Sequence, residues 1–315
     1  MLSRHAETLF WIGRYVERSS YITRMMDVAY NKQLERSARS SDEVWWDLLR
    51  VLYLEDDYRA EYGEDVTTAS INRYLVFDTE NSSSVKSSVT QARTNMMNVR
   101  DIVPLELLET MNRLHAQLGA GGLEDFVEQT PHQIYETVAG QCRAITGAVD
   151  EAMPRDDGYR FLMIGRLLER AEMTCRMVDV NRTVSGRDVS SWMTVLRSVS
   201  GFHAFTREHG PLAPADEVVE FMLLEPSFPF GVLHCLQRAW QLTQEVIGAG
   251  TWQSPRLAGR LTADLQYADI PAVDSPDLEG VLERIENGIR ETSEALHHDL
   301  YQFGGDPLLY SFEAL

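Results

Sequence analysis

Two segments of this chain contain nearly the same charged sequence motif among large apolar residues. Residues 9–28 read LFWIGRYVERSSYITRMMDV, and residues 161–180 read FLMIGRLLERAEMTCRMVDV. The motif G-R-x-x-E-R occurs in both, and nine of the twenty aligned positions are identical at an offset of 152 residues. Further along, YLVFD (74–78) aligns with FMLLE (221–225) at an offset of 147. The repeat therefore spans most of the chain and constrains it to fold as two similar parts.

The length of the repeat and the spacing of apolar residues together predict the fold. Solenoid repeats are about 20–50 residues long, so offsets of 152 and 147 indicate a duplicated domain instead. Apolar residues recur every three or four positions, and Pro and Gly gather in short breaks such as GAGG (119–122). We therefore predict an all-α protein, an internally duplicated helical bundle. Its halves, 1–153 and 154–315, are expected to pack as one compact unit about a pseudo-two-fold axis.

The expected helices divide evenly between these halves. Each expected range begins and ends where the apolar periodicity fails or where Gly and Pro interrupt it. The ranges are 3–38, 42–61, 66–76, 83–102, 104–118, 123–152, 158–183, 189–208, 215–224, 229–248, 254–267 and 276–302.

The charged residues of the repeated motif do not lie on a separate polar face. On a helical projection, Arg18 falls about 40° and Trp11 about 60° from Arg14, so the charges lie within the apolar stripe. Glu169 and Arg170 are interleaved with apolar residues in the same way. Because buried Arg and Glu are rarely found unless they are paired, the pattern predicts ion pairs in the interface where the two motif helices meet.

Two interpretations of these charges remain open. In the first, Glu17 and Glu169 each bridge arginines of their own and the facing helix and fix the register between the halves, without a necessary gain in stability. In the second, the arginines outnumber the carboxylates, and the surplus binds a carboxylate or phosphate in bidentate fashion. The candidate anion-binding residues are Arg14, Arg18, Arg24, Arg166, Arg170 and Arg176.

A second polar segment, FDTENSSSVKSSVTQARTNMMNVRD, covers residues 77–101. Asp78, Asn81 and Ser84 supply cap and turn chemistry ahead of an expected helix, and Arg93 and Arg100 share one face of that helix. Helix capping explains these residues without a ligand. Alternatively, they form a second polar pocket in which the helix N-terminus and the two arginines receive an anion. The aligned positions in the second half lack these serines and arginines, so such a pocket is expected in the first half only.

Composition narrows the classes of partner. The formal net charge is −19, and binding to a nucleic-acid backbone is not expected because it depends on clustered Lys and Arg. No apolar run approaches the roughly 20 residues of a membrane helix, and Arg4, His5 and Glu7 stand where an export signal would be apolar. Three cysteines without a C-x-x-C pattern fit a reducing compartment. We expect a cytoplasmic protein that contacts neither membrane nor nucleic acid.

Motifs of known cofactor or metal chemistry are missing from the sequence. There is no phosphate-binding loop, no G-x-G-x-x-G and no H-E-x-x-H. A single E-x-x-H, from Glu294 to His297, is too little for a helical-bundle di-iron site, which needs two such motifs and two further glutamates. Neither a cofactor nor a metal is expected, and the sequence leaves open whether the chain is an enzyme.

The repeated motifs and the serine-rich segment together resemble one protein family. MLSRHAETLFWIGRYVERSSYITRMM resembles the opening of the bacterial Alpha-E proteins, which are all-helical and named for an E-R motif, and GRLLERAEMTCRM resembles their second copy. DTENSSSVKSSVTQARTNMMNVRD is similar to their D-x-x-N-P-S-S-I segment and the A-R-x-N-x-x-x-V-R that follows it, with Ser82 in place of proline and Val85 in place of isoleucine. The resemblance covers essentially the full chain.

The resemblance implies a role beside other enzymes. Alpha-E proteins are typically encoded next to circularly permuted ATP-grasp enzymes and transglutaminase-like proteins, sometimes with a proteasome-like peptidase. This implies a system that makes or trims a peptide or an amide-linked modification. We expect an accessory or co-catalytic partner of the ATP-grasp amide ligase, whose arginines hold a carboxylate or phosphate. The alternatives are a stand-alone enzyme with Glu17 or Glu169 as catalytic general base, or a purely structural scaffold.

Overall fold

A computed structural model of the chain describes residues 3–34, 41–119, 131–185, 188–248 and 252–304. Over these residues it contains fourteen α-helices, one π-helix and no β-strand, which confirms the prediction of an all-α protein. The N-terminal part consists of α1 (Ser3–Leu34), α2 (Ser41–Val51), α3 (Glu55–Tyr62), α4 (Thr68–Asn72), the π-helix η1 (Arg73–Phe77), α5 (Val85–Asn98), α6 (Leu105–Gly119) and α8 (Pro131–Ala152). The C-terminal part consists of α9 (Asp157–Ser185), α10 (Val189–Ser198), α11 (Phe202–His209), α12 (Ala215–Leu224), α13 (Val232–Ile247), α14 (Gln253–Gln266) and α15 (Pro276–Gly304).

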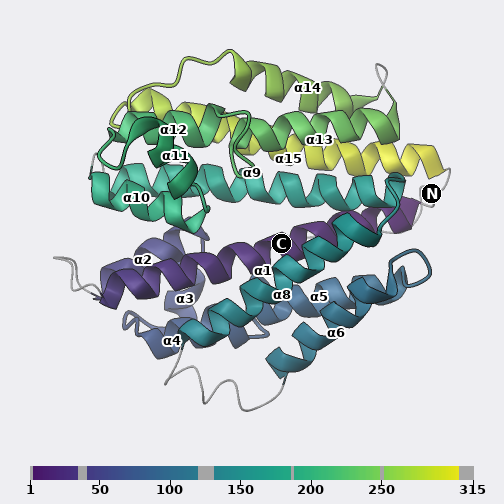
Figure 1. Cartoon of the computed structure of the whole chain (residues 1–315), viewed down its shortest axis with the longest axis horizontal. Coiled ribbons are helices and arrows are strands. Elements are labelled where there is room, and N and C mark those ends of the chain that lie inside the picture. The colour runs from purple at the N-terminus through teal and green to yellow at the C-terminus, as the bar shows by residue number, and fades with distance from the viewer. Residues whose placement is uncertain (1–2, 35–40, 120–130, 186–187, 249–251, 305–315) are drawn as a thin grey trace.

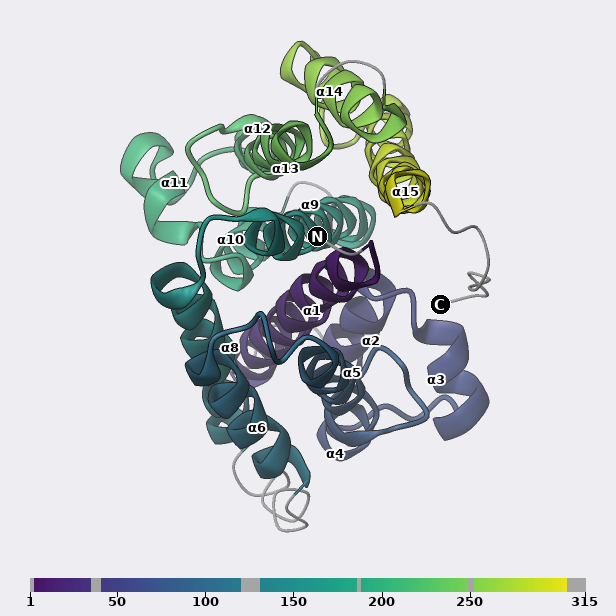
Figure 2. The same ribbon diagram turned by 90° about the vertical axis from the view of Figure 1, so that its right-hand side faces the viewer.

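Helices α1 and α9 lie side by side through the middle of the molecule (Figures 1 and 2). α1 packs against α5 and α8, and α9 packs against α13 and α15. Three further contacts cross between the parts, because α2 packs on α9, and α10 and α15 pack on α1. Each central helix is therefore packed against helices of both parts.

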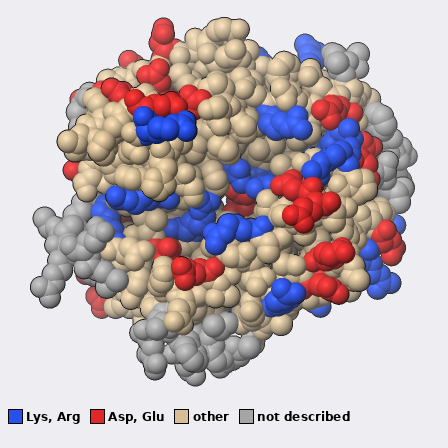
Figure 3. All heavy atoms as spheres, viewed as in Figure 1, with Lys and Arg blue, Asp and Glu red and all other residues tan. Residues whose placement is uncertain are grey.

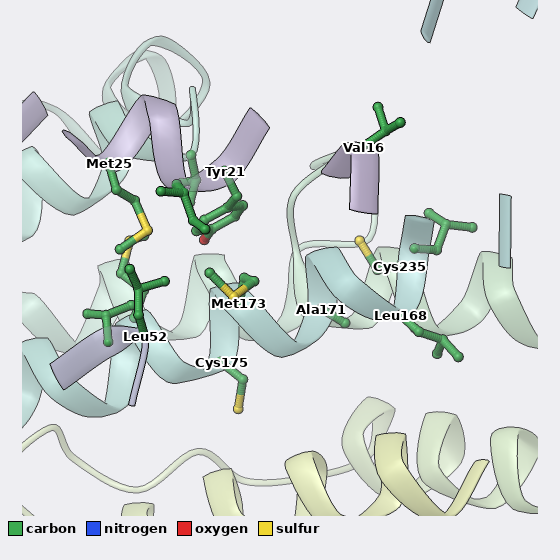
Figure 4. Close-up of a cluster of buried hydrophobic side chains, with 14 of the residues drawn as sticks. Val16, Tyr21, Met25, Leu52, Leu168, Ala171, Met173, Cys175 and Cys235 are labelled. Carbon is green, nitrogen blue, oxygen red and sulfur yellow. The ribbon is translucent and has the colours of Figure 1, made fainter. Parts of the chain in front are cut away.

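Large apolar side chains fill the interface between the central helices. Figure 4 shows Tyr21 pointing from α1 toward Met173 of α9. Cys175 and Cys235 belong to the same buried cluster, and with Cys142 they are free thiols whose pKa values are raised by burial. All three cysteines therefore act as small apolar core groups.

The central helices approach each other closely at a pair of glycines. A Cβ added to Gly13 would lie 2.0 Å from the carbonyl oxygen of Leu162, and one added to Gly165 would lie 2.0 Å from the carbonyl oxygen of Phe10. Both contacts involve backbone atoms, which can move aside only if the helices separate. The glycine of each G-R-x-x-E-R motif therefore sets the spacing of the two helices.

Two expected helices are each broken in two, which corrects their predicted bounds. The range 42–61 is divided between α2 and α3, and the range 189–208 between α10 and α11. At the breaks, Tyr53 and Ser200 take the left-handed backbone conformation, each with φ of 56°. The next backbone N–H then bonds back to the preceding helix, a capping arrangement in which glycine is the usual left-handed residue. The breaks were missed because neither left-handed position carries a glycine.

The remaining expected helices agree with the observed bounds to within four residues wherever the structure describes them. Parts of two expected helices, 35–38 and 123–130, lie outside the described residues. The expected helix 66–76 is α4 continued by the π-helix η1. Within the described ranges, no helix has an apolar stretch long enough to cross a bilayer.

Elements of the two parts correspond at an offset of 147 residues. Helices α3 and α11 end at Tyr62 and His209, each followed by a glycine, and α5 and α13 begin at Val85 and Val232. The two left-handed residues at the helix breaks have the same offset. The correspondence thus extends from the sequence repeat to helix ends and backbone conformation.

Gly13→Ala is expected to lower the free energy of unfolding by about 1–3 kcal/mol, the usual cost of overpacking an interior, because its Cβ would collide with the backbone of α9. Gly147→Ala in α8 is the matched control, since nothing lies within 4 Å of its added Cβ. That control should gain about 0.5–1 kcal/mol from helix propensity. Urea unfolding followed by circular dichroism measures both changes, and equal effects would contradict the close-packed crossing.

Candidate functional site

The charged residues of the two G-R-x-x-E-R motifs meet in the interface between α1 and α9. Spacings of three and four residues place the arginines and the glutamate of each motif on one side of its helix, facing the other helix. Both glutamates are buried, with 4% of Glu17 and 2% of Glu169 exposed. The predicted ion pairs between the motif helices are present, and they form two clusters.

The first cluster is centred on Glu17 of α1. Arg170 of α9 binds its carboxylate in bidentate fashion, with Nε 2.6 Å from Oε1 and Nη2 2.9 Å from Oε2. Arg166 donates from Nε to Oε2 at 3.1 Å. Nη1 of Arg170 also donates to the carbonyl of Pro229 at 3.1 Å, which fixes the loop before α13 against the cluster. The Glu17 cluster is defined as Glu17, Arg24, Arg143, Arg166 and Arg170.

The second cluster is centred on Glu169 of α9. Arg18 donates to both carboxylate oxygens, at 2.7 Å from Nε and 3.2 Å from Nη2. Nε of Arg14 lies 2.6 Å from Oε2 of Glu169, and Nη2 of Arg14 donates to Glu172 at 2.8 Å. Arg176 also pairs with Glu172. The Glu169 cluster is defined as Glu169, Glu172, Arg14, Arg18 and Arg176.

The ion pairs of the two motifs are reciprocal. Each motif glutamate is bound by both arginines of the facing motif. Within the described residues, neither motif glutamate pairs with an arginine of its own helix, which corrects the expectation that each would bridge both helices. Every ion pair of the motif glutamates therefore crosses the interface.

Guanidinium contacts keep both motif glutamates charged despite their burial. Burial alone would raise the pKa of Glu17, but attraction and hydrogen bonds from Arg170 and Arg166 outweigh it and lower the pKa from its usual 4.5 to about 2. Burial likewise opposes ionisation of Glu169, and its arginines prevail and lower its pKa. A carboxylate held so firmly as an anion is a poor general base at neutral pH.

The two clusters differ in their supply of carboxylates. Glu172 in the second copy aligns with Ser20 in the first. Arg176 therefore pairs with Glu172, whereas the equivalent Arg24 donates a hydrogen bond to the hydroxyl of Ser200. In the Glu169 cluster, three arginines pair with two carboxylates. In the Glu17 cluster, two arginines pair with the one carboxylate, and Arg24 and Arg143 have no carboxylate partner among the described residues. The sequence prediction missed Glu172. The alignment of the two copies contains a signal for it, because an acidic residue stands there in the second copy and a serine in the first.

Arg24 is a half-buried cation that has no carboxylate partner among the described residues. Its guanidinium carbon lies 4.5 Å from the centre of the Phe230 ring, and that of Arg170 lies 4.1 Å from the same ring. Burial lowers the pKa of Arg24; attraction from Glu17 opposes this effect, and repulsion from Arg170 and Arg143 adds to it. Because a desolvated charge without a partner is costly, this position favours an added anion.

A band of Lys and Arg side chains crosses the middle of the face on which α8 lies, between the helices of the two parts (Figure 3). Arg143 of α8 is exposed and makes no hydrogen bond or ion pair with another described residue. In a chain with a net charge of −19, a basic band is a local exception. Positive charge near Arg24 is therefore open to solvent as well as buried.

Three of the five residues predicted for the second polar pocket come together in the turn before α5. Ser84 caps α5, and its hydroxyl donates to the carbonyl of Asp78 at 2.5 Å. The Asn81 side chain donates to the carbonyl of Tyr74 at 3.0 Å. These three side chains therefore hold the turn and the start of the helix.

The structure does not bring the two predicted arginines to this turn. Nε of Arg93 donates to Asn112 of α6 at 2.7 Å, so it joins two neighbouring helices. Arg100 is exposed, with Nε 3.9 Å from Asp101. The five residues thus do not form one pocket, because Arg93 lies well along α5 and bonds to α6, and Arg100 lies beyond the C-terminal end of α5.

Glu17→Gln is expected to lower the free energy of unfolding by about 3–5 kcal/mol at pH 7, because it leaves Arg166 and Arg170 largely buried beside an uncharged group. Since the folded pKa of Glu17 is lowered, its contribution is fully present above pH 4.5 and is lost as the pH falls toward about 2. Urea unfolding from pH 7 downward should show the two proteins converging in that window. Glu109→Gln, an exposed change in α6, is the control. A difference that stays constant at low pH would contradict this account.

The family comparison agrees with the geometry of the repeated motif. Glu17 with Arg18, and Glu169 with Arg170, are the two consecutive E-R pairs at the interface of α1 and α9. No curated protein and no solved structure matches the chain. Residues 1–300 match Alpha-E, described as a predicted alpha-helical domain with a conserved ER motif. With a match over nearly its whole length, the chain belongs to the Alpha-E family.

Proposed function

We propose that this chain is a cytoplasmic accessory or co-catalytic partner of a circularly permuted ATP-grasp amide ligase, in a bacterial system that makes or modifies a peptide. In this proposal, the Glu17 cluster binds a carboxylate or phosphate group of a ligand shared with the ligase. The observation that carries the proposal is Arg24, a half-buried cation with no carboxylate partner among the described residues.

The chemistry around Arg24 suits a carboxylate or a phosphate. A guanidinium offers two parallel N–H donors to such a group, and the bond is strengthened by both charges. The hydroxyl of Ser200 already binds Arg24 and is placed to contact the same ligand. Arg143 adds a further exposed cation. An amide ligase joins a carboxylate to an amine, so its substrates carry a group that this cluster fits.

Two other features support an accessory role in the cytoplasm. The net charge of −19 provides an acidic surface for a basic partner surface. Three free, buried thiols suit a reducing compartment. The ATP-grasp ligase is the first partner in this proposal, and a transglutaminase-like protein is the second.

We also propose that the bundle arose by internal duplication, with halves 1–153 and 154–315 related by a pseudo-two-fold axis. The reciprocal ion pairs and the reciprocal contacts of Gly13 and Gly165 support this proposal, since each is repeated with the roles of the two helices exchanged. The shared offset of 147 residues in helix ends supports it independently. On this view the second copy acquired Glu172, and only the first kept an unneutralised cluster.

A stand-alone enzyme and a pure scaffold each explain fewer of these contacts than the anion-binding proposal does. As a stand-alone enzyme, the chain would use Glu17 or Glu169 as general base, but both have lowered pKa values and guanidinium groups on their oxygens. As a pure scaffold, the chain would need the reciprocal pairs but not the extra arginines. The surplus of positive charge around Glu17 therefore favours the anion-binding proposal.

Arg24→Gln is expected to change the free energy of unfolding by less than about 1 kcal/mol, because it removes a poorly compensated cation. Arg176→Gln at the equivalent position should destabilise the protein, because Glu172 keeps only Arg14. Citrate or phosphate should raise the melting temperature of the wild type and of Arg176→Gln in a saturable way, compared with chloride at equal ionic strength. Arg24→Gln should lose this response, and an unchanged response would contradict an anion site at Arg24.

Reconstitution with the neighbouring ligase tests the partnership. We expect the two proteins to co-purify, and we expect amide formation to fall when this chain is left out or replaced by Arg24→Gln. Arg143→Gln should lower amide formation less than Arg24→Gln does, because Arg143 is exposed. A failure of the two proteins to associate even with ATP and substrate present would overturn the partnership. The melting-temperature response to citrate or phosphate would still test the anion site at Arg24 separately.

A further inference from the structure

A cavity of about 650 Å³ lies beside the π-helix η1, away from the motif glutamates. It opens to solvent and is lined by residues of α3, α4, η1, the start of α5 and the adjoining turns. Its volume is within the range of about 300–1,000 Å³ that is typical of small-molecule sites. Its lining residues are Glu61, Tyr62, Thr67, Ala69, Ser70, Arg73, Phe77, Asp78, Thr79 and Lys86.

Two carboxylates, Glu61 and Asp78, contribute negative charge to the cavity. Asp78 is held in place, because the N–H of Glu80 donates to its Oδ1 at 2.9 Å and the hydroxyl of Tyr62 donates to its Oδ2 at 3.0 Å. Glu61 is exposed as a residue, yet desolvation of its carboxyl group and then the adjacent Asp78 carboxylate raise its pKa. Neighbouring carboxylates of this kind are stabilised by a cation bound between them.

Two basic residues, Arg73 and Lys86, also line the cavity. Arg73 is the first residue of η1, and its side chain is exposed. No ion pair within 4.0 Å joins Arg73 to Glu61, Asp78 or any other described residue. Arg73 and the two carboxylates therefore line one cavity without a direct ion pair between them.

This mixture of charges belongs to the N-terminal part alone. Positions 147 residues later carry Glu220 where Arg73 stands and Leu233 where Lys86 stands. The backbone differs at the same place, because α12 is a continuous α-helix where α4 gives way to the π-helix. Short π-helical segments are less well hydrogen-bonded than α-helix and recur at functional sites. The cations and the unusual backbone thus occur together at the cavity.

We propose that the cavity beside η1 binds a small zwitterion with a free amino group and a free carboxylate, the chemistry of an α-amino acid. The ammonium group lies at Glu61 and Asp78, and the carboxylate lies at Arg73. A simple cation would be repelled by Arg73, and a simple anion by the two carboxylates, so a ligand with both charges is favoured. The hydroxyl of Thr79 also lines the cavity and can bind a remaining polar atom, whereas the hydroxyls of Thr67 and Ser70 already hydrogen-bond within the cap of α4.

Calorimetric titration of the full chain with L-alanine and L-glutamate tests the site. We expect saturable binding of at least one of them, and at least tenfold weaker binding of its N-acetyl and carboxamide derivatives, each of which lacks one charge. Absence of saturable binding by both free amino acids, or equal binding of the blocked derivatives, would overturn the proposal.

Substitutions at two exposed residues test which side chain binds the ammonium group and which binds the carboxylate, and they are not expected to disturb folding. Glu61→Gln and Arg73→Gln should each weaken the binding of the free amino acid at least tenfold. Both variants should keep the wild-type melting temperature. Matched changes outside the cavity, Glu106→Gln and Arg100→Gln, should leave binding unchanged. Arg24→Gln should also leave it unchanged, so this site and the proposed anion site can fail separately. Binding that survives both cavity variants would place the ligand elsewhere.

Discussion

The close approach of α1 and α9 is the constraint on which the rest of the structure depends. Gly13 and Gly165 leave no room for a side chain where the two backbones meet. The glutamate that follows each glycine therefore lies against the facing helix, and it is bound by guanidinium groups from the opposite motif. Buried charge is tolerated here because every carboxylate oxygen has a donor. The outer helices pack on both sides of this crossing, whose distance and register are set by the glycines and the ion pairs.

Much of the fold could be predicted because the signals are local. Apolar periodicity gave the all-α class and most helix ends, and charges within the apolar stripe gave the ion pairs between motif helices. The breaks at Tyr53 and Ser200 could not be predicted, because neither residue type marks a left-handed backbone. The partner of each glutamate also could not be predicted, because it depends on how two distant helices cross.

The candidate sites were harder to predict, because they combine residues from several elements. A count of motif residues indicated a surplus of arginines, but only the contacts of Glu172 assign that surplus to the cluster around Glu17. Arg93 was expected near the cap of its own helix and instead joins α6. The cavity beside η1 brings together Glu61 and Arg73 from elements whose packing no local pattern describes.

The long separation between Glu17 and its arginines has a consequence for the nascent chain. Arg166 and Arg170 follow Glu17 by 149 and 153 residues, so α1 is synthesised long before either partner exists. Translation proceeds from the N-terminus, and early segments begin to fold as they emerge. Until α9 emerges, the carboxylate of Glu17 needs water, and that side of α1 stays hydrated. Docking of α9 then expels the water and neutralises the charge in one step, which makes this crossing a late event in the folding of the whole chain.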